Sequence, residues 1–405
     1  MLQGKHIVVG ISGGIAAYKI PEMIRELIRQ GAAVRVTTTK HALEFVTELT
    51  LQTLSGARVY SDVFAAINEH ATEHISLPEW ADAMIIAPAT ANVLGKLASC
   101  IADDALTTTF AAMRKPVVIA PAMNDKMYLN PATQRAMNLL SETENIMMMD
   151  CVSGFLACGS EGKGRMPEAD RIIEALKYAL SPKPLSGKRV LITAGPTQEK
   201  IDPVRFISNY STGKMAFALA RTCYRKGADV RLVCGPVTVP VPQAFPALSK
   251  TGTIDTIPVR TALEMAAAAE QEWQSADIGI LCAAVADFMP EEVADEKIKR
   301  EGDTLTLTLR PTRDIAASLG KSKRAEQRLV GFALETQHEQ ANAQAKLSKK
   351  NLDLIVLNSL RDSGAGFGTD TNKVTIFHKD GTKKDCPLLS KEAVAEEIIE
   401  QMLIS

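Results

Sequence analysis

The sequence predicts an α/β protein of two domains, each built around a parallel β-sheet. The chain has 405 residues, more than the roughly 250–300 at which a single core usually divides. Two similar openings, GKHIVVGISGGIAAYK at 4–19 and GKRVLITAGPTQEK at 187–200, each place an apolar strand before a glycine-containing turn. A proline-containing segment at 181–188 separates them and is typical of a linker. We therefore place the domains at 1–181 and 187–405.

The first domain reads as a strand, a helix and then further strands. A helix is expected over 21–31, where PEMIRELIRQG has apolar residues at helical spacing and ends in glycine. Strands are expected over 33–39, 83–90 and 116–123. Their continuous apolar character is typical of parallel strands that are buried on both faces.

The second domain repeats this pattern and then adds a hairpin. A helix is expected over 215–227, and the closing KEAVAEEIIEQML at 391–403 reads as an amphipathic helix. A hairpin over 373–389 is expected to turn at Asp380-Gly381. The expected strands are 229–235, 278–286, 328–335 and 352–359.

The composition excludes several classes of partner. Lysine and arginine are scattered through a chain of net charge −1, which predicts neither a nucleic-acid nor a membrane partner. The apolar run before Ser12 is too short for a signal peptide or a membrane span. The seven cysteines contain no CxxC pair. These features predict a cytoplasmic protein with reduced thiols.

Polar residues follow several strands of the first domain. The backbone N–H groups of Gly13 and Gly14, between a strand and a helix, are suited to an anion. Because the GxGxxG pattern of dinucleotide folds is lacking, a mononucleotide phosphate is favoured over NAD. APATAN at 87–92 and APAMN at 120–124 each put polar residues directly after a strand, so both are expected in one crevice. Helix N-capping by Thr90 and Asn124 explains the same spacing equally well.

Three motifs occur in order between residue 5 and about residue 180: GISGGIAAYK, PAMNDKMY and ACGSEGKGRM. In them the sequence resembles the family of flavin-dependent cysteine decarboxylases. The resemblance implies a flavodoxin-like, FMN-binding, trimer-forming domain that decarboxylates 4'-phosphopantothenoylcysteine. It implies catalytic roles for His74, Asn124 and Cys158, the last as a proton donor on a flap. The implied FMN-binding residues are Ser12, Gly13, Gly14, Thr39, Thr90 and Asn92.

The chemistry of this decarboxylation accounts for a flavin. Direct loss of CO2 from a cysteinyl carboxylate leaves an unstabilised carbanion. Oxidising the thiol to a thioaldehyde creates an electron sink, and the protein supplies orientation and protons. A histidine suits the removal of the thiol proton. Apart from the resemblance, a lone histidine such as His74 is more often a surface or packing residue, whereas Cys158 stands unusually among glycines in a polar loop.

ISNYSTGKM at 207–215 almost forms a phosphate-binding P-loop, but Met215 stands where that motif needs Ser or Thr. The stretch still suits an anion, because the N–H groups at the start of a helix are unpaired. We expect the helix to be capped by Ser211 or Thr212.

The stretch ITAGPTQEKIDPVRFISNYSTGKM begins a similarity, from about residue 187 to the end, to the phosphopantothenate–cysteine ligase domain. The bacterial form of this domain uses CTP, which activates the carboxylate as an acyl-cytidylate before the cysteine amine attacks. The resemblance implies a role for Asn209 in the acyl-cytidylate step. It also implies Mg²⁺ or Mn²⁺ with CTP, although no metal ligand can be named. The implied nucleotide-binding residues are Cys282, Ala283, Asp287, Lys297, Arg313, Asp314, Ile315, Phe332, Lys346 and Lys350. Without the resemblance, these lysines would be interpreted as a charged surface that is exposed to solvent.

The sequence departs from these families at three places. Cys100 stands where many relatives have glycine, and Ala216 also replaces a usual glycine. TRDI at 312–315 replaces Asn-Pro-Asp-Ile, with the proline displaced to 311.

The leading hypothesis is a bifunctional enzyme of coenzyme A synthesis acting on 4'-phosphopantothenate, cysteine and CTP. By family it is a homo-oligomer, a dodecamer of decarboxylase trimers and ligase dimers. A non-catalytic regulatory subunit is disfavoured because His74 and Cys158 are both present. A decarboxylase of peptide C-terminal cysteines is disfavoured by the attached ligase domain.

Overall fold

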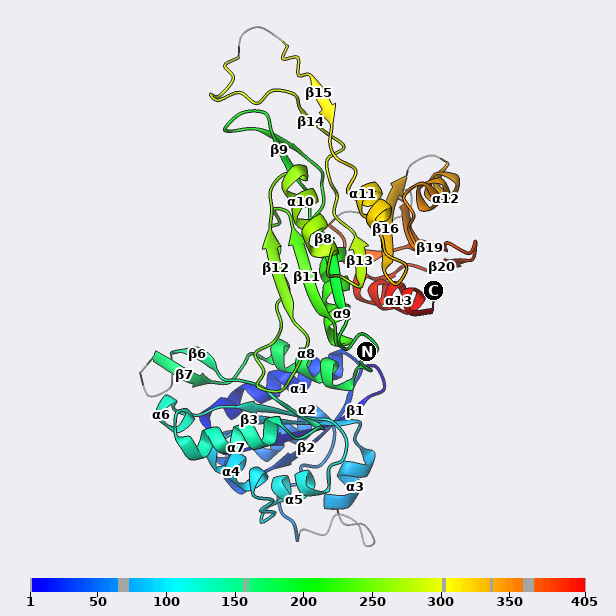
Figure 1. Cartoon of the computed structure of the whole chain (residues 1–405). Coiled ribbons are helices and arrows are strands. Elements are labelled where there is room, and N and C mark those ends of the chain that lie inside the picture. Colours follow the sequence, from blue (N-terminus) through cyan, green and yellow to red (C-terminus); the bar gives the residue numbers. More distant parts are fainter. Residues whose placement is uncertain are drawn as a thin grey trace. The chain divides into compact units, whose positions relative to one another are not determined.

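The computed structural model describes residues 2–64, 73–155, 159, 161–300, 304–335, 338–359 and 368–404. The chain forms two compact units (Figure 1). The first comprises Met1–Pro182 with Phe245–Thr251, and the second comprises Lys183–Ala244 with Gly252–Ser405.

The first unit is built on a five-stranded sheet in the order β2-β1-β3-β4-β5, in which every pairing is parallel. Its strands are β1 His6–Ile11, β2 Ala33–Thr38, β3 Ala83–Ala89, β4 Val117–Pro121 and β5 Ile146–Met148. This is the flavodoxin strand order, in which the direction of winding reverses between β1 and β3 and opens a crevice at the carboxyl ends of the strands.

Helices cover both faces of this sheet, and all seven residues of β3 are buried. α1 illustrates why the helices form: it buries Ile20, Met23, Ile24 and Leu27, at the spacing of one helical face. The helices are α1 Ile20–Arg29, α2 Glu48–Ser55, α3 Glu73–Trp80, α4 Ala91–Ala98, α5 Ala105–Ala112, α6 Asp125–Tyr128, α7 Pro131–Ser141 and α8 Ala169–Leu180. An antiparallel hairpin that was not predicted from the sequence, β6 Val152–Phe155 with β7 Glu161–Arg165, precedes α8.

The segment 245–251 belongs to the first unit although it lies far along the chain. Met149 and Ala247 form an antiparallel bridge, and the Met148 N–H donates to Ser249 Oγ at 2.9 Å. The ring of Phe245 meets Tyr178 edge-on at 5.4 Å. The segment therefore covers β5, the edge strand of the first sheet, which would otherwise expose unpaired backbone groups.

The second unit is built on an eight-stranded sheet in the order β12-β11-β8-β13-β16-β17-β19-β20. Its strands are β8 Arg189–Ala194, β11 Asp229–Cys234, β12 Ile254–Pro258, β13 Ile278–Leu281, β16 Arg328–Glu335, β17 Leu354–Ser359, β19 Val374–His378 and β20 Lys383–Asp385. The six strands from β12 to β17 are parallel and have the 3-2-1-4-5-6 order of the Rossmann fold. β19 and β20 add the predicted antiparallel hairpin.

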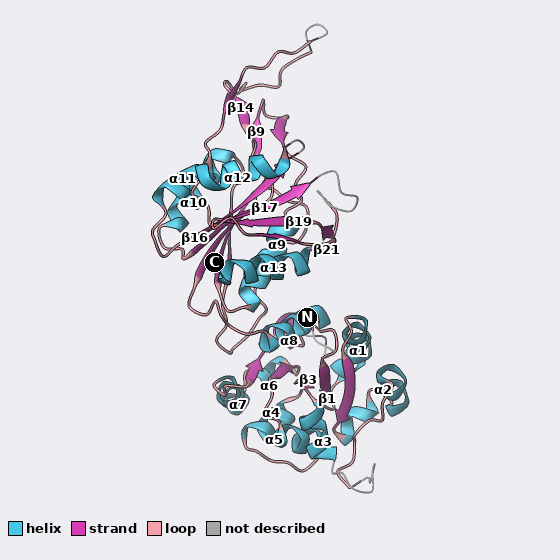
Figure 2. Ribbon diagram, turned by 90° about the vertical axis from the view of Figure 1, so that its right-hand side faces the viewer, coloured by secondary structure: helices cyan, strands magenta, loops and turns pink. Residues whose placement is uncertain are grey.

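Helices lie on both faces of the second sheet (Figure 2). α9 Lys214–Arg225 packs with α13 Lys391–Ile404, while α10 Ala262–Trp273, α11 Ile315–Ser322 and α12 Glu339–Lys349 lie on the opposite face. The side chain of Arg225 is buried and lies 3.2 Å from Glu392 of α13. This ion pair joins the two helices of one face.

The predicted fold class is confirmed, since the chain has two α/β units with parallel sheets, flavodoxin-like and Rossmann-like in strand order. The strand expected over 278–286 is shorter, because β13 ends at Leu281 and the apolar residues after it leave the sheet. β12 was not predicted, and it is a partly exposed edge strand without a continuous apolar run.

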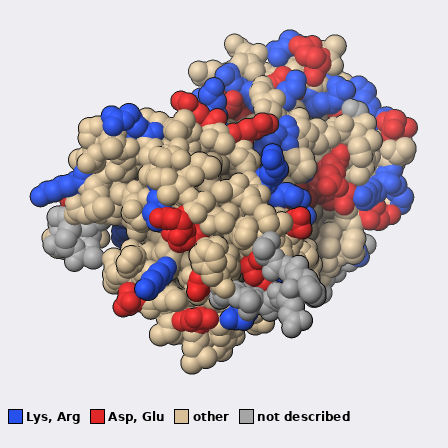
Figure 3. Space-filling model, turned by 90° about the horizontal axis from the view of Figure 1, so that it is seen from below, with Lys and Arg blue, Asp and Glu red and all other residues tan. Residues whose placement is uncertain are grey.

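On the face that Figure 3 shows, acidic and basic side chains are interspersed among uncharged ones. Within the described part of the chain, no helix is long and apolar enough to cross a lipid bilayer.

Two candidate active sites

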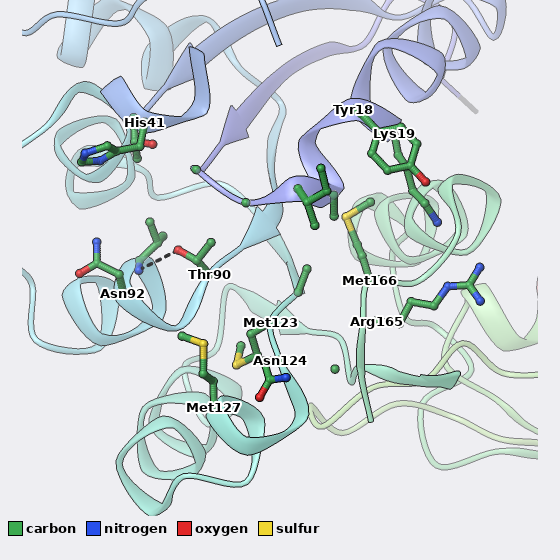
Figure 4. Close-up of a pocket in the computed structure, with 18 of the residues that line it drawn as sticks. Tyr18, Lys19, His41, Thr90, Asn92, Met123, Asn124, Met127, Arg165 and Met166 are labelled. Carbon is green, nitrogen blue, oxygen red and sulfur yellow. Dashed lines mark hydrogen bonds between the residues drawn. The ribbon is translucent and has the colours of Figure 1, made fainter. Parts of the chain in front are cut away.

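A cavity of about 900 Å³ opens at the carboxyl ends of β1, β2, β3 and β4 in the first unit (Figure 4). Of the residues predicted to bind FMN or substrate, those on its wall are Gly13, Gly14, Thr39, Thr90, Asn92 and Asn124. They follow four neighbouring strands, which is why the fold brings them together. Ile15, Val93 and Met123 add apolar surface to the same wall.

The turn after β1 requires glycine because it approaches the loop after β2. A Cβ atom on Gly13 would lie 2.5 Å from the His41 Cβ, and one on Gly14 would lie 3.2 Å from Thr90 Cγ2. A larger residue at position 13 would push these loops apart and change the cavity wall.

Ser12 lies behind the wall and does not line the cavity. Its side chain is fully buried, donates to the Pro88 carbonyl at 2.7 Å and accepts from the Thr90 N–H at 3.1 Å. Ser12 therefore holds the ends of β1 and β3 together and places Thr90.

Thr90 and Asn124 cap helices and line the cavity at once. Thr90 Oγ1 accepts from the Val93 N–H at 3.4 Å at the start of α4 (Figure 4), and Asn124 Oδ1 accepts from the Lys126 N–H at 2.9 Å. Helix capping and a position in a shared crevice are thus compatible interpretations of their spacing, because the cap fixes each residue at the cavity wall.

The cavity is suited to a flavin mononucleotide in size and in polarity. Thr39 Oγ1 is buried and has no hydrogen-bond partner among the described residues, although Thr39 borders the cavity. A ligand acceptor or donor at this point would satisfy it. The sequence did not single out the cationic residues on this wall. Lys19 and Arg165 both contact Glu168, at 3.1 and 2.5 Å, and Lys96 pairs with Asp103 and Asp104. Lys19 belongs to the GISGGIAAYK motif, which was the available signal.

Among the described residues, one predicted catalytic residue is not brought to this wall. His74 lies in α3 and does not line the cavity of its own chain. Cys158 lies outside the described residues.

A second cavity of about 850 Å³ opens in the second unit, at the ends of β8, β13, β16 and β17. Asn209 and all of the predicted nucleotide-binding residues except Lys297 line it. Lys297 is exposed on the segment between β14 Phe288–Pro290 and β15 Leu309–Pro311, off the cavity wall.

The turn before α9 differs from the expectation of a Ser or Thr cap. The N-cap residue is Gly213, at φ +78, and no side chain caps the helix. Instead the Ser211 Oγ accepts from the Gly213 N–H at 3.3 Å. The left-handed backbone explains the glycine. The uncapped N–H groups of the first helical turn border the cavity, where an anion would pair with them.

Asn209 is held by its amide group. Its Nδ2 donates to the carbonyls of Ala284 and Val285, at 3.2 and 3.1 Å. These carbonyls lie in the irregular stretch after β13, so the shortening of that strand creates part of the site.

Two of the cations that are predicted to bind the nucleotide are already paired with carboxylates. Lys350 Nζ lies 2.9 Å from Asp314, and Arg313 lies 2.6 Å from Glu270. Burial alone would raise the pKa of Asp314, but hydrogen bonds from the Ala317 N–H and Lys350 outweigh it and lower that pKa. The carboxyl group of Asp314 is therefore ionised at neutral pH. Among the described residues, no group of three or more His, Cys, Asp or Glu side chains forms a metal site.

Comparison with known proteins gives full-length relatives. Residues 185–404 match the family "DNA/pantothenate metabolism flavoprotein C-terminal domain", and residues 1–181 match the family "Flavoprotein". The coenzyme A biosynthesis bifunctional protein CoaBC of Bacillus subtilis is 46% identical over 405 residues, 99% of this chain and 97% of the relative. A cysteine/cysteine sulfinic acid decarboxylase from an unknown prokaryotic organism is 48% identical over 363 residues, 88% of this chain and 99% of the relative. A crystal structure of the C-terminal domain of a CoaBC protein is 40% identical and covers 55% of this chain and 97% of that domain, with a TM-score of 0.45.

Proposed function

The chain belongs to the family of coenzyme A biosynthesis bifunctional proteins, and on this premise we propose how its two cavities divide the reactions. The protein is a bifunctional enzyme with a decarboxylase and a ligase activity. The ligase cavity joins cysteine to 4'-phosphopantothenate with CTP, and the first cavity decarboxylates the resulting 4'-phosphopantothenoylcysteine. The observation that carries this assignment is that each cavity lies at the switch point of its sheet and gathers side chains from several strand ends.

In the first cavity we assign FMN to the wall formed by the turns after β1, β2 and β3. When bound, FMN supplies a reversible two-electron acceptor for the substrate thiol. The N–H group of Gly13 and the hydroxyl of Thr39 would hold its phosphate, whereas the Gly14 N–H already donates to the Ser12 carbonyl at 3.0 Å. Thr90 and Asn92 would border its ring system. Asn124 would bind the substrate carboxylate, and Cys158 would return a proton to the product.

His74 would accept the thiol proton, but it lies off the cavity wall of its own chain. Its role therefore requires that another copy of the chain, or a rearrangement of α3, brings the imidazole to the substrate. The first alternative agrees with the proposed homo-oligomer.

In the second cavity we assign the nucleotide to the end lined by Phe332, Lys346 and Lys350. A carboxylate oxygen of 4'-phosphopantothenate attacks the α-phosphorus of CTP, and pyrophosphate leaves. The cysteine nitrogen then attacks the acyl carbon, loses a proton and displaces CMP. Cations stabilise the charge that accumulates on the phosphates, and Mg²⁺ or Mn²⁺ would accompany the triphosphate. Asn209, fixed by two carbonyls, would orient the acyl group.

The decisive experiment incubates the protein with 4'-phosphopantothenate, cysteine and each nucleoside triphosphate in turn, and follows products by mass. CTP should support formation of 4'-phosphopantothenoylcysteine and then its decarboxylated product. The purified protein should be yellow, with the absorbance of bound FMN. A colourless protein that takes up no added FMN contradicts the first assignment, and equal use of all nucleotides contradicts the second.

The relative named as a cysteine/cysteine sulfinic acid decarboxylase favours a second candidate, decarboxylation of free cysteine. It is tested by offering cysteine without CTP or 4'-phosphopantothenate and measuring cysteamine. We expect none, because 4'-phosphopantothenoylcysteine is supplied by the ligase cavity of the same chain. Release of cysteamine at the rate of the complete reaction favours the second candidate.

A further inference from the structure

A cluster of three polar side chains beside the first cavity is not used by the steps above. Asp150 follows β5, and its carboxylate accepts from the hydroxyl of Tyr128 at 2.8 Å and from the ammonium group of Lys163 at 2.5 Å. The ammonium group also lies 5.2 Å from the centre of the Tyr128 ring, within the range of a cation–π contact. This Asp150 cluster joins two elements, because Tyr128 ends α6 and Lys163 lies in β7.

The ion pair of this cluster is charged but open to water. Burial alone would lower the pKa of Lys163, but hydrogen bonds to Asp150 and Tyr128 outweigh it and raise that pKa. The side chain of Asp150 is 18% exposed and that of Lys163 is 41% exposed. A pair exposed to this extent contributes little to stability. The function of the pair is therefore better sought in where it holds β7.

Both elements that the cluster joins hold the turn that carries Asn124. Asn124 is the N-cap of α6, and its carbonyl accepts from the Tyr128 N–H at 2.9 Å. On the other side of the turn, the Met123 N–H donates to the carbonyl of Gly164 in β7, also at 2.9 Å. Met123 and Asn124 lie together on the wall of the first cavity (Figure 4), and Gly164 lines it too. A shift of α6 or β7 would therefore move Asn124.

The contact between β7 and this turn leaves no room for a side chain. A Cβ atom on Gly164 would lie 2.3 Å from the Met123 carbonyl oxygen, and one on Gly162 would lie 2.9 Å from the Asp125 Cβ. The two glycines flank Lys163, so the ion pair is attached at the centre of the contact. Because the strand packs directly against the turn, no flexible side chain absorbs a displacement of β7.

The backbone at Asp150 is held on both sides. Its N–H donates to the Pro246 carbonyl at 3.1 Å, in the segment 245–251 that covers β5. The next residue, Cys151, is buried, and its thiol donates to the carbonyl of Pro121, the last residue of β4, at 3.5 Å. A side chain on a fixed backbone can hold its partners in one geometry. Asp150 is therefore suited to fixing the positions of α6 and β7.

We propose that Asp150 is a positioning residue of the decarboxylase site. Through its two partners it holds α6 and β7, and so fixes Asn124 in the geometry that binds the substrate carboxylate. The proposal rests on the role of Asn124 proposed above. Asp150 itself touches no substrate, since it is not among the residues that line the cavity. Its effect comes from holding the binding group in place before the substrate arrives.

The test compares two ligands of the FMN-loaded, full-length protein. The analogue 4'-phosphopantothenoylserine keeps the carboxylate but has no thiol to be oxidised, whereas the product 4'-phosphopantetheine has no carboxylate. The change in flavin absorbance on binding gives a Kd for the first cavity alone. Asp150→Ala should raise the Kd of the serine analogue about 10-fold or more, and change that of the product by no more than about 2-fold. A residue with a merely structural role would affect both ligands alike.

Matched variants complete the comparison. Lys163→Met frees β7 but leaves the buried Tyr128 hydroxyl paired, so it should show the same selective loss at about 3-fold or more. The exposed Glu161 lies in β7 too, and Glu161→Ala should match wild type for both ligands. All variants should retain FMN, because its assigned wall is formed by the turns after β1, β2 and β3.

Asn124→Leu separates this proposal from the function on which it rests. It should also lose affinity for the serine analogue and keep affinity for the product. If that selective loss appears in Asn124→Leu but not in Asp150→Ala, Asp150 does not position the site. Lys163→Met decides in the same way if Asp150→Ala does not fold. If Asn124→Leu binds both ligands as wild type does, the role of Asn124 fails and the proposal with it. If wild type does not convert added 4'-phosphopantothenoylcysteine, the decarboxylase function itself fails.

Discussion

The ammonium group of Lys350 lies 2.9 Å from the carboxylate of Asp314 on the lining of the second cavity. The sequence assigns both residues to the nucleotide, yet here they bind each other. Asp314 Oδ1 also accepts from the Ala317 N–H at 3.0 Å and so caps α11. One carboxylate thus starts a helix and holds a lysine at the cavity wall.

Asp314→Ala and Asp314→Asn separate these two roles. The alanine variant loses the cap and should lower the free energy of unfolding by about 1 kcal/mol. Asparagine still caps the helix, so the asparagine variant should lose only a few tenths of a kcal/mol in the free energy of unfolding. Both variants release Lys350. Urea unfolding followed by circular dichroism measures the difference. Equal losses in the two variants would show that the ion pair, not the cap, is the stabilising contact.

Ser12→Ala should damage the decarboxylase domain from behind the cavity wall. Removing the hydroxyl leaves the Thr90 N–H without its buried partner, which costs about 1–3 kcal/mol, while the Pro88 carbonyl still accepts from the backbone N–H of residue 12. Because Thr90 borders the cavity, FMN should also dissociate more readily. Urea unfolding and retention of the flavin absorbance on gel filtration are the measurements. The exposed Ser99 gives the control Ser99→Ala. A Ser12→Ala protein with the same stability and the same flavin retention as this control would contradict the role of Ser12.

Mixing inactive variants tests whether decarboxylase sites are shared between copies of the chain. His74 lies off the cavity that Asn124 lines. If a neighbouring copy supplies the imidazole, each active site combines Asn124 of one copy with His74 of another. A His74→Gln copy then still provides an intact Asn124, and an Asn124→Leu copy still provides an intact His74. Each variant alone should be inactive. Unfolding and refolding equal amounts of the two together should restore about a quarter of the activity, in sites that combine both intact residues. Absence of any recovery, with mixed oligomers present by native mass spectrometry, would place both residues in one chain.

Much of the fold was predictable because its strands are buried on both faces and therefore appear as continuous apolar runs. β16 and β3 lie where such runs occur. The same rule fails at 282–286, which is apolar yet lines a cavity instead of continuing β13. The segment 245–251 gives no local signal, because its pairing with β5 depends on residues about a hundred positions earlier.

The sites were predictable to the extent that their residues follow strand ends or family motifs. Thr90 and Asn209 are of this kind. Lys214 and Lys391 come together only in the folded chain, through a shared contact with residues 368–370, and no spacing in the sequence predicts it. The cap of α9 was predicted wrongly because Ser and Thr are common N-caps, whereas here a left-handed Gly213 occupies the position.

Cys100→Gly should stabilise the first domain. Cys100 is one of the few described non-glycine residues with positive φ, at +53. The left-handed conformation costs a residue with a Cβ atom about 1 kcal/mol, and glycine avoids this cost. Part of the gain is offset because glycine also makes the unfolded chain more flexible. Cys100→Ala keeps the Cβ atom and should match wild type, with the glycine variant up to about 1 kcal/mol more stable than both. Thermal unfolding compares the three, and a glycine variant less stable than alanine would contradict strain at this position.

Asp202 should control the segment that carries Lys297. Its carboxylate is buried and accepts from the N–H groups of Val204 and Arg205, at 2.8 Å each, and from the Ile298 N–H at 3.2 Å. Asp202→Asn removes the charge that holds Arg205 and weakens the contact to Ile298. Trypsin should then cut near Lys297 faster, and ligase kcat should fall while decarboxylation of added 4'-phosphopantothenoylcysteine is unchanged. Asp295→Asn, an exposed change in the same segment, is the control.

The pH dependence gives this role of Asp202 a second measurement. Hydrogen bonds from Arg205 and from three backbone N–H groups hold the pKa of Asp202 well below its ordinary value. A carboxyl whose pKa is lowered on folding stabilises the protein fully above its unfolded pKa, about 3.9, and loses that contribution as the pH falls toward the folded pKa. The free energy of unfolding of wild type should therefore exceed that of Asp202→Asn by a constant amount from about pH 7 to 5, and this difference should shrink below about pH 4. A difference that is the same at pH 3 and pH 7 would show that the charge of Asp202 does not hold this segment.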